Sequence, residues 1–105
     1  MPNSLQSFKA DLFKALAHPM RIRILELLRG GEKNVGELMT ALGVEGSSVS
    51  QQLAILRMKN IVDTRKEGST IYYRLRSEQF NELLDVARRI FDQQVGELRA
   101  LGRAR

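Results

Sequence analysis

The 105-residue sequence contains no cysteine and only one histidine, His18. The absence of thiols excludes disulfides, thiolate zinc sites, iron–sulfur clusters and cysteine nucleophiles. A single imidazole excludes a multi-histidine metal site within one chain. No Gly-rich phosphate loop or paired catalytic motif is visible, so the sequence predicts a protein that is not an enzyme.

Long hydrophobic runs are also absent. No apolar segment reaches the roughly 20 residues needed to span a bilayer. The first residues, MPNSLQSFKADLF, lack the basic and apolar parts of a secretory signal. We therefore expect a cytoplasmic protein with no membrane partner.

The composition is that of one folded domain, which we expect to cover residues 1–105. Hydrophobic residues make up 43% of the chain, enough for a packed core. Lysine and arginine number 17 against 12 acidic residues, which gives a net charge of +5. This balance favours an anionic partner. At this length a lone monomer is only modestly stabilised, and a dimer interface would help.

Apolar residues recur at helical spacing in four segments before residue 60. The first is 5–17, and the second starts at Pro19 and ends at Gly30-Gly31. A short third helix over 36–42 ends at Gly43. A fourth, capped by Ser47 or Ser48, runs to about Met58. A short strand is possible near Asn34-Val35.

The pattern then changes period. Residues 61–66 and 70–75 are rich in β-branched and aromatic residues around a turn at 67–69, which predicts a hairpin. Ile71, Tyr73 and Leu75 are expected to face inward. Helical spacing returns over 77–101, with Ser77 as the cap. The order predicts a mainly α winged helix-turn-helix with five helices, its helix-turn-helix at about 36–58 and its wing at about 61–75.

The start of the fourth helix carries small polar side chains opposite its apolar face. Serine donates to phosphates or bases, and glutamine pairs with the adenine edge in the major groove. In a helix-turn-helix, bases are read by the first residues of the second helix. This predicts DNA contacts by Ser47, Ser48, Ser50 and Gln51; the alternative is a plain surface helix with a serine cap.

Positive charge is concentrated after this helix. Between Ser47 and Arg76 there are six basic and two acidic residues, so this segment holds +4 of the net +5. Arg65 and Lys66 lie beside the hairpin turn, where they are placed to reach phosphates or a minor groove. The alternative is that these charges only protect an edge strand.

Three stretches resemble the ArsR/SmtB family of bacterial transcription regulators: LFKALAHPMRIRILELL, VGELMTALGVEGSSVSQQLAILRMKNIV and RKEGSTIYYRL. The resemblance covers roughly residues 8–76. It implies a homodimeric winged-helix repressor that binds an imperfect inverted repeat in double-stranded DNA and releases it when an effector binds. Gln51 and Gln52 stand where the family often has histidine. The positions that match the family's DNA contacts are Ser47, Ser48, Ser50, Gln51, Gln52, Arg65 and Lys66.

The first and last helices have more apolar surface than a small core can cover. A symmetric dimer would bury both stripes, and reading an inverted repeat requires two recognition helices one DNA turn apart. The alternative is that helices 5–17 and 77–101 cover each other within a monomer. The predicted interface residues are Leu5, Phe8, Leu12, Phe80, Leu84, Ala87, Phe91 and Leu98.

The metal sites of the best-known family members are incomplete here. The third helix has no cysteine pair, and although Asp85 matches an acidic ligand position, Ala87 stands where a histidine is needed. His18, before Pro19, is predicted to be a cap or packing residue. It is also a weak candidate, with Asp11 or Glu26, for a nickel or zinc site. We predict no cofactor, and the effector is left open among a small molecule, a metal ion, a partner protein or none.

Two other functions fit the fold. A winged-helix adaptor for protein partners would keep the apolar stripes but would not need the concentrated positive charge. A non-specific DNA-binding protein would bind scrambled and operator DNA equally well. Salt dependence and sequence preference of DNA binding separate these readings.

Overall fold

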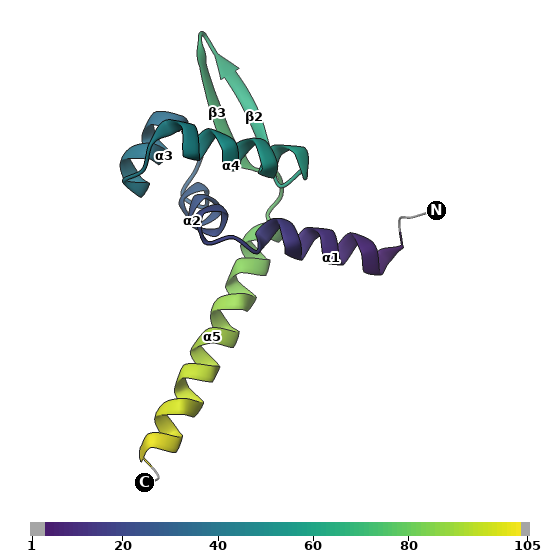
Figure 1. Cartoon of the computed structure of the whole chain (residues 1–105), viewed down its shortest axis with the longest axis vertical. Helices are drawn as coiled ribbons and strands as arrows, with labels where there is room; N and C mark the ends of the chain where they lie inside the picture. Colours follow the sequence, from purple (N-terminus) through teal and green to yellow (C-terminus); the bar gives the residue numbers. More distant parts are fainter. Residues whose placement is uncertain (1–3, 104–105) are drawn as a thin grey trace.

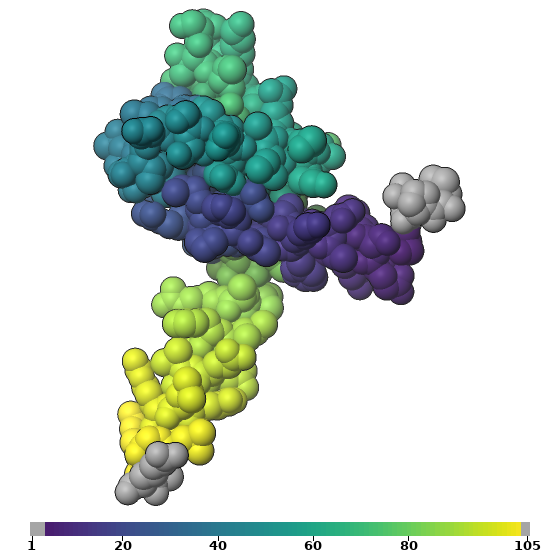
Figure 2. Space-filling model, viewed as in Figure 1, coloured from purple at the N-terminus to yellow at the C-terminus, as the bar shows by residue number. Residues whose placement is uncertain are grey.

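The structure is a computed structural model that describes residues 4–103. It consists of a small helical body from which a β-hairpin and a long helix project at opposite ends (Figures 1 and 2). The molecule measures 60 × 42 × 23 Å. The elements in chain order are α1 (Leu5–Leu16), α2 (Pro19–Leu28), β1 (Lys33–Asn34), α3 (Val35–Leu42), α4 (Gly46–Met58), β2 (Val62–Glu67), β3 (Thr70–Leu75) and α5 (Gln79–Arg103). This is the predicted order, with a winged helix-turn-helix formed by α3, α4 and the hairpin.

The core lies between α2, α3, α4 and the base of the hairpin. Burying each large aliphatic side chain contributes roughly 1.5–3 kcal/mol. The spacing of Val49, Leu53 and Leu56 puts all three on one face of α4, and none of them is exposed. The fully buried side chains are Ile24, Leu25, Leu38, Val49, Leu53, Leu56, Ile61 and Val62.

His18 caps α2, as predicted. Its backbone is extended, and its Nδ1 accepts a hydrogen bond of 3.1 Å from the backbone N–H of Met20. Pro19 occupies the first helical position, where its missing N–H costs nothing. The imidazole is therefore used in local structure.

The turn between α3 and α4 depends on two glycines. Gly43 ends α3 in the left-handed conformation, with φ of 68°. At Gly46 a Cβ atom would lie 2.9 Å from the sulfur of Met39, so only glycine allows α4 to start this close to α3. Because α4 already starts at Gly46, its N-cap is Glu45, which makes no side-chain capping bond. The prediction that Ser47 or Ser48 caps this helix is wrong.

The wing is part of a three-stranded antiparallel sheet in the order β1-β3-β2. Glu67 pairs with Thr70, so the hairpin turn is Gly68-Ser69 and is one residue shorter than predicted. Tyr73 and Leu75 pack against the core, but Ile71 is 41% exposed. The prediction that Ile71 faces inward is wrong because the outer half of the hairpin extends beyond the body.

The last helix begins at Gln79, two residues later than predicted. The backbone carbonyl of Ser77, rather than a side-chain cap, accepts a bond from the N–H of Phe80. Within Gln79–Arg103, Leu84 is the one buried side chain. Arg29 of α2 donates to Asp85 at 2.6 Å and ties the start of α5 to the body. No helix in residues 4–103 is long and apolar enough to cross a membrane.

Candidate DNA-binding surface

The N-terminal half of α4 presents polar side chains to solvent. Ser47, Ser48, Ser50 and Gln51 are all exposed, whereas Val49 between them is fully buried. Because Glu45 is the N-cap and makes no side-chain bond, the hydroxyls of Ser47 and Ser48 are not used for capping. The wrong capping prediction therefore leaves both hydroxyls available to a ligand.

Gln52 is placed differently from these four residues. Its side-chain oxygen accepts a hydrogen bond of 3.0 Å from Arg21, whose Nε donates to the carbonyl of Ala15 at 2.6 Å. The side chain is half-buried and joins α4 to the junction between α1 and α2. The geometry thus gives Gln52 a structural role.

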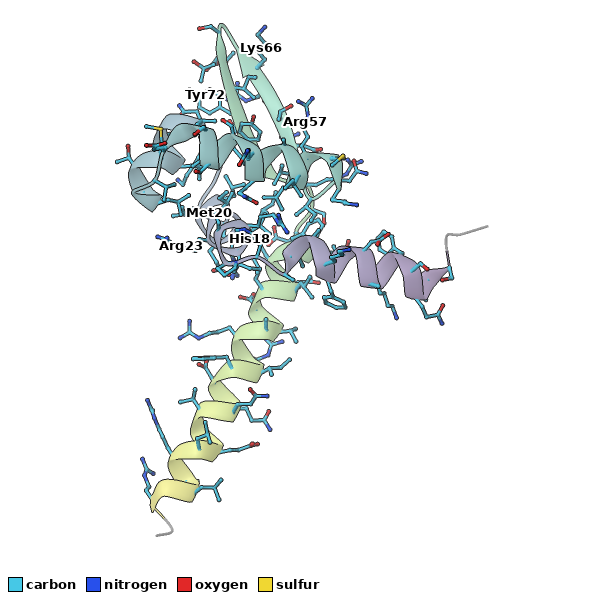
Figure 3. All side chains as sticks on the ribbon, in the orientation of Figure 1. His18, Met20, Arg23, Arg57, Lys66 and Tyr72 are labelled. Atoms are coloured by element: carbon cyan, nitrogen blue, oxygen red, sulfur yellow. The ribbon has the colours of Figure 1, made fainter. Side chains whose placement is uncertain are left out.

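The two basic side chains of the wing also differ. Lys66 lies near the tip of the hairpin (Figure 3) and is exposed. Among residues 4–103 it forms no ion pair within 4 Å. It is therefore placed to meet a phosphate group.

Arg65, in contrast, is held by its neighbours. It donates to Glu32, just before β1, at 2.7 and 3.1 Å, and it lies 3.5 Å from the carboxylate of Glu67. Its guanidinium also stacks on the ring of Tyr72, 4.8 Å from the centroid. The hydrogen bond with Glu32 raises the pKa of Arg65 and lowers the pKa of Glu32. We call this group the Glu32–Arg65 clamp; it joins the wing to the segment that leads into α3.

A groove of about 490 Å³ separates the recognition helix from the wing. Ser50 lines it on the α4 side, Gly36 on the α3 side, and Ser69 and Thr70 on the wing. Sequence reasoning did not single out Ser69, Thr70 or Gly36. Their proximity depends on β1 pairing with β3, and no local pattern reports this pairing.

A second group of basic residues lies at the base of the wing. Arg57, Arg74 and Arg76 surround a hollow of about 310 Å³, and Figure 3 shows Arg57 beside β2. Arg76 lies 3.5 Å from Asp63, so one of these three charges is partly compensated. Their charge is visible in the sequence, but the fold is what brings Arg57 of α4 next to two residues of β3 and its end.

Comparison with known proteins agrees with this geometry. Residues 18–64 match the sequence profile described as "Bacterial regulatory protein, arsR family". The chain is 46% identical over 87 residues to the uncharacterized HTH-type transcriptional regulator Rv0081 of Mycobacterium tuberculosis, covering 82% of this chain and 76% of that protein. The chain belongs to the ArsR family. The predicted resemblance is confirmed.

Two further relatives have names that state a direction of regulation. A biofilm growth-associated repressor of Agrobacterium fabrum is 43% identical over 82 residues, covering 78% of this chain and 70% of that one. The transcriptional activator HlyU of Vibrio cholerae is 39% identical over 82 residues, covering 78% and 76%. ArsR-family membership thus identifies a transcriptional regulator with a DNA-binding helix-turn-helix.

Solved structures of ArsR-family proteins share this fold. The crystal structure of Rv0081 superposes with a TM-score of 0.83 at 42% identity, covering 90% of this chain and 96% of that one. The solution structure of the homodimeric winged helix-turn-helix domain of Mb0332 from Mycobacterium bovis gives 0.78 at 34% identity, covering 85% and 82%. The predicted fold class is confirmed.

The acidic position expected for an ArsR-family metal site is occupied in another way. Asp85 pairs with Arg29, so its carboxylate is engaged within the chain. Among residues 4–103, no three carboxylate or histidine side chains come together as a metal site.

The predicted dimer residues fall into two groups. Leu84 belongs to the core of the single chain, and Leu12 and Phe80 are half-buried against it. The others are exposed: Leu5, Phe8, Ala87, Phe91 and Leu98.

Proposed function

We propose that this ArsR-family protein is a homodimeric repressor that binds an inverted-repeat operator. The observation that carries the proposal is the surface formed by the exposed start of α4 and the unpaired Lys66 of the wing. The serines and Gln51 supply hydrogen-bonding groups of a size that fits the major groove. Lys66 and the basic residues at the base of the wing supply phosphate contacts.

The two chemical tasks are divided between α4 and the wing. Gln51 is the residue whose amide can make paired hydrogen bonds with an adenine, so it carries sequence preference. Arg57 and Lys66 carry charge without base selectivity and set the register on the duplex. Gln52 is engaged with Arg21, so we assign it to positioning the helix.

Dimerisation is supported by the exposed apolar stripe on α5. Phe91 is 60% and Leu98 68% exposed, and both lie on the part of α5 that projects from the body. A symmetric pair buries these side chains and places two recognition helices side by side. The homodimeric state stated for the Mb0332 domain agrees with this arrangement.

Repression needs only occupation of the operator, which the proposed surface provides by itself. The named relatives include a repressor and an activator, so the fold serves both directions. We further propose a cytoplasmic protein without catalytic activity and without a resident metal or cofactor.

The test is fluorescence-anisotropy titration of labelled upstream DNA and of a scrambled duplex, at several salt concentrations. We expect a preference for the upstream DNA. Gln51→Ala should reduce that preference by roughly 1–3 kcal/mol, because a base contact is lost. Lys66→Ala should weaken binding to both duplexes and lower the slope of log K against log salt by about 0.9.

The control is Gln93→Ala, a glutamine on α5 far along the chain from the recognition helix. It should change neither preference nor salt slope. Equal affinity of the unaltered protein for both duplexes would favour a non-specific DNA-binding protein. The absence of binding to either would favour the protein-interaction adaptor.

A further inference from the structure

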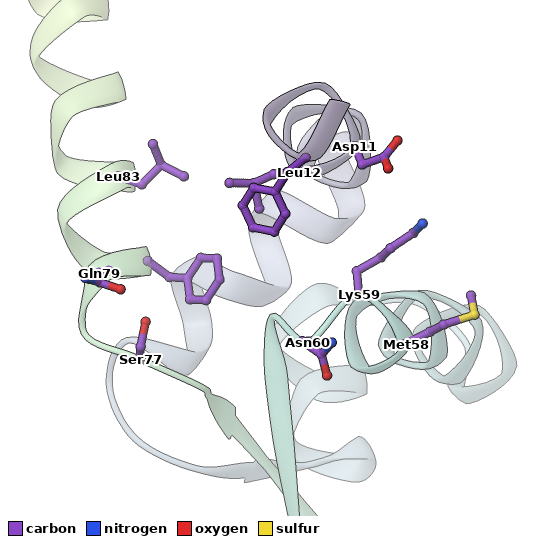
Figure 4. A pocket seen from close by; sticks show the side chains of 10 residues that line it. Asp11, Leu12, Met58, Lys59, Asn60, Ser77, Gln79 and Leu83 are labelled. Atoms are coloured by element: carbon purple, nitrogen blue, oxygen red, sulfur yellow. The ribbon is translucent and has the colours of Figure 1, made fainter. Parts of the chain in front are cut away.

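A hollow of about 520 Å³ lies where α1, the end of α4 and the start of α5 meet (Figure 4). Its walls are apolar and consist of Phe8 and Leu12 from α1 and Phe80 and Leu83 from α5. Small-molecule sites are commonly hollows of roughly 300–1,000 Å³ with apolar walls and a few polar groups. The size and lining of this hollow match that description.

The mouth of the hollow carries one charge of each sign. Asp11 of α1 and Lys59 at the end of α4 lie on the same side of it (Figure 4). Within residues 4–103, neither side chain takes part in an ion pair shorter than 4 Å. The two charges cancel, so a ligand with net charge is attracted by one and repelled by the other. A polar end that offers an acceptor to Lys59 and a donor to Asp11 satisfies both.

The hollow also touches both joints of the wing. Lys59 and Asn60 connect α4 to β2, and Ser77 connects β3 to α5. Asn60 has a positive φ of 60°, and its side-chain oxygen accepts a bond of 3.1 Å from Arg76. A ligand in this hollow therefore contacts the segments that fix the recognition helix and the wing relative to each other.

We propose that this hollow is an effector site for a small apolar molecule with a neutral or zwitterionic polar end. Occupancy shifts the joint at Asn60 and so changes operator affinity. This second step rests on the proposed DNA-binding function.

A second copy of the chain is the competing occupant, since Phe8, Leu12 and Phe80 are among the predicted dimer residues. The charged mouth argues against it. Charged residues are depleted in the centre of protein interfaces, and two unpaired charges would have to be buried there.

Two dyes with the same aromatic body test the site. N-phenyl-1-naphthylamine is neutral, and 8-anilino-1-naphthalenesulfonate adds one negative charge. Both are titrated by fluorescence against the full chain. Phe8→Ser removes an apolar wall and should weaken both dyes by about fivefold or more. Phe13→Ser is the matched control, since Phe13 is 57% exposed on the same helix and does not line the hollow.

The charge of the mouth is tested by Asp11→Asn. This change leaves Lys59 uncompensated, so binding of the sulfonate dye should improve by about threefold or more while that of the neutral dye stays constant. Equal effects of Phe8→Ser and Phe13→Ser, or an unchanged ratio of the two dyes in Asp11→Asn, would overturn the site. Loss of dye binding as the protein is concentrated into dimers would assign the hollow to the second copy.

The coupling to DNA is measured separately. Saturating neutral dye should change operator affinity by about fivefold or more in the unaltered protein and not in Phe8→Ser. An unchanged operator affinity despite normal dye binding overturns the effector role. If the protein binds no DNA, the proposed function fails, and the dye titrations still decide whether the site exists.

Discussion

Individual side chains of the wing have different tasks, although the sequence shows only adjacent basic residues. In the free protein, the charge of Arg65 is neutralised by Glu32 and Glu67. We predict that Glu32→Gln releases the guanidinium for a phosphate. The slope of log K against log salt should then steepen by about 0.9, measured on scrambled DNA by anisotropy.

The double variant Glu32→Gln/Arg65→Ala controls this prediction, because it removes the same carboxylate without providing a free guanidinium. Its slope should stay near that of the unaltered protein. If the double variant steepens as much as the single one, the effect comes from net charge alone and the clamp does not restrain Arg65.

The clamp also has a defined pH range. The Arg65 guanidinium lowers the pKa of Glu32, so the stabilisation it provides is present above the ordinary range of glutamate and is lost as the pH falls through the lowered pKa. NMR titration of the Glu32 carboxyl should give a midpoint below about 4.3. In Arg65→Ala the midpoint should return to that value, and an unchanged midpoint would contradict the geometry.

Sequence reasoning found the candidate site at this scale but not its internal contacts. The exposure of Gln51 follows from helical spacing alone. The engagement of Gln52 and Arg65 does not, because their partners Arg21 and Glu32 are 31 and 33 positions away. Only the fold brings these pairs together.

Among the elements, α3 has the most complete cap. The Asn34 side chain accepts from the N–H of Glu37 at 2.8 Å, and the Glu37 carboxylate accepts from the N–H of Asn34 at 2.9 Å. We predict that Asn34→Ala lowers the free energy of unfolding by about 1 kcal/mol, measured by urea denaturation. Thr40→Ala on the same helix removes an exposed bond to Gly36 and should cost less than about 0.5 kcal/mol.

The elements themselves were largely predictable, because periodicity and glycine signals agree along most of the chain. The errors occur where a distant contact decides. Gly46 can start α4 because it packs on Met39, so the serines lie inside the helix. Ile71 alternates correctly, but the body does not extend far enough to cover it.

For the whole molecule, the projecting part of α5 makes self-association measurable. We predict that Leu98→Glu shifts the protein from dimer to monomer in sedimentation velocity and abolishes tight operator binding, because a charge would be buried in the interface. Gln93→Glu adds the same charge to the same helix but beside the polar pair formed by Gln93 and Glu97, and it should remain dimeric. A dimeric Leu98→Glu would exclude this stripe as the interface.

The exposed stripe of α5 has a consequence for the living cell. At low abundance the number of paired chains rises as the square of the number of chains made. A cell that halves its stock of this protein would lose about three quarters of its pairs. The bare helix thereby turns a gradual change in synthesis into a steeper change in the expression of the genes under its control.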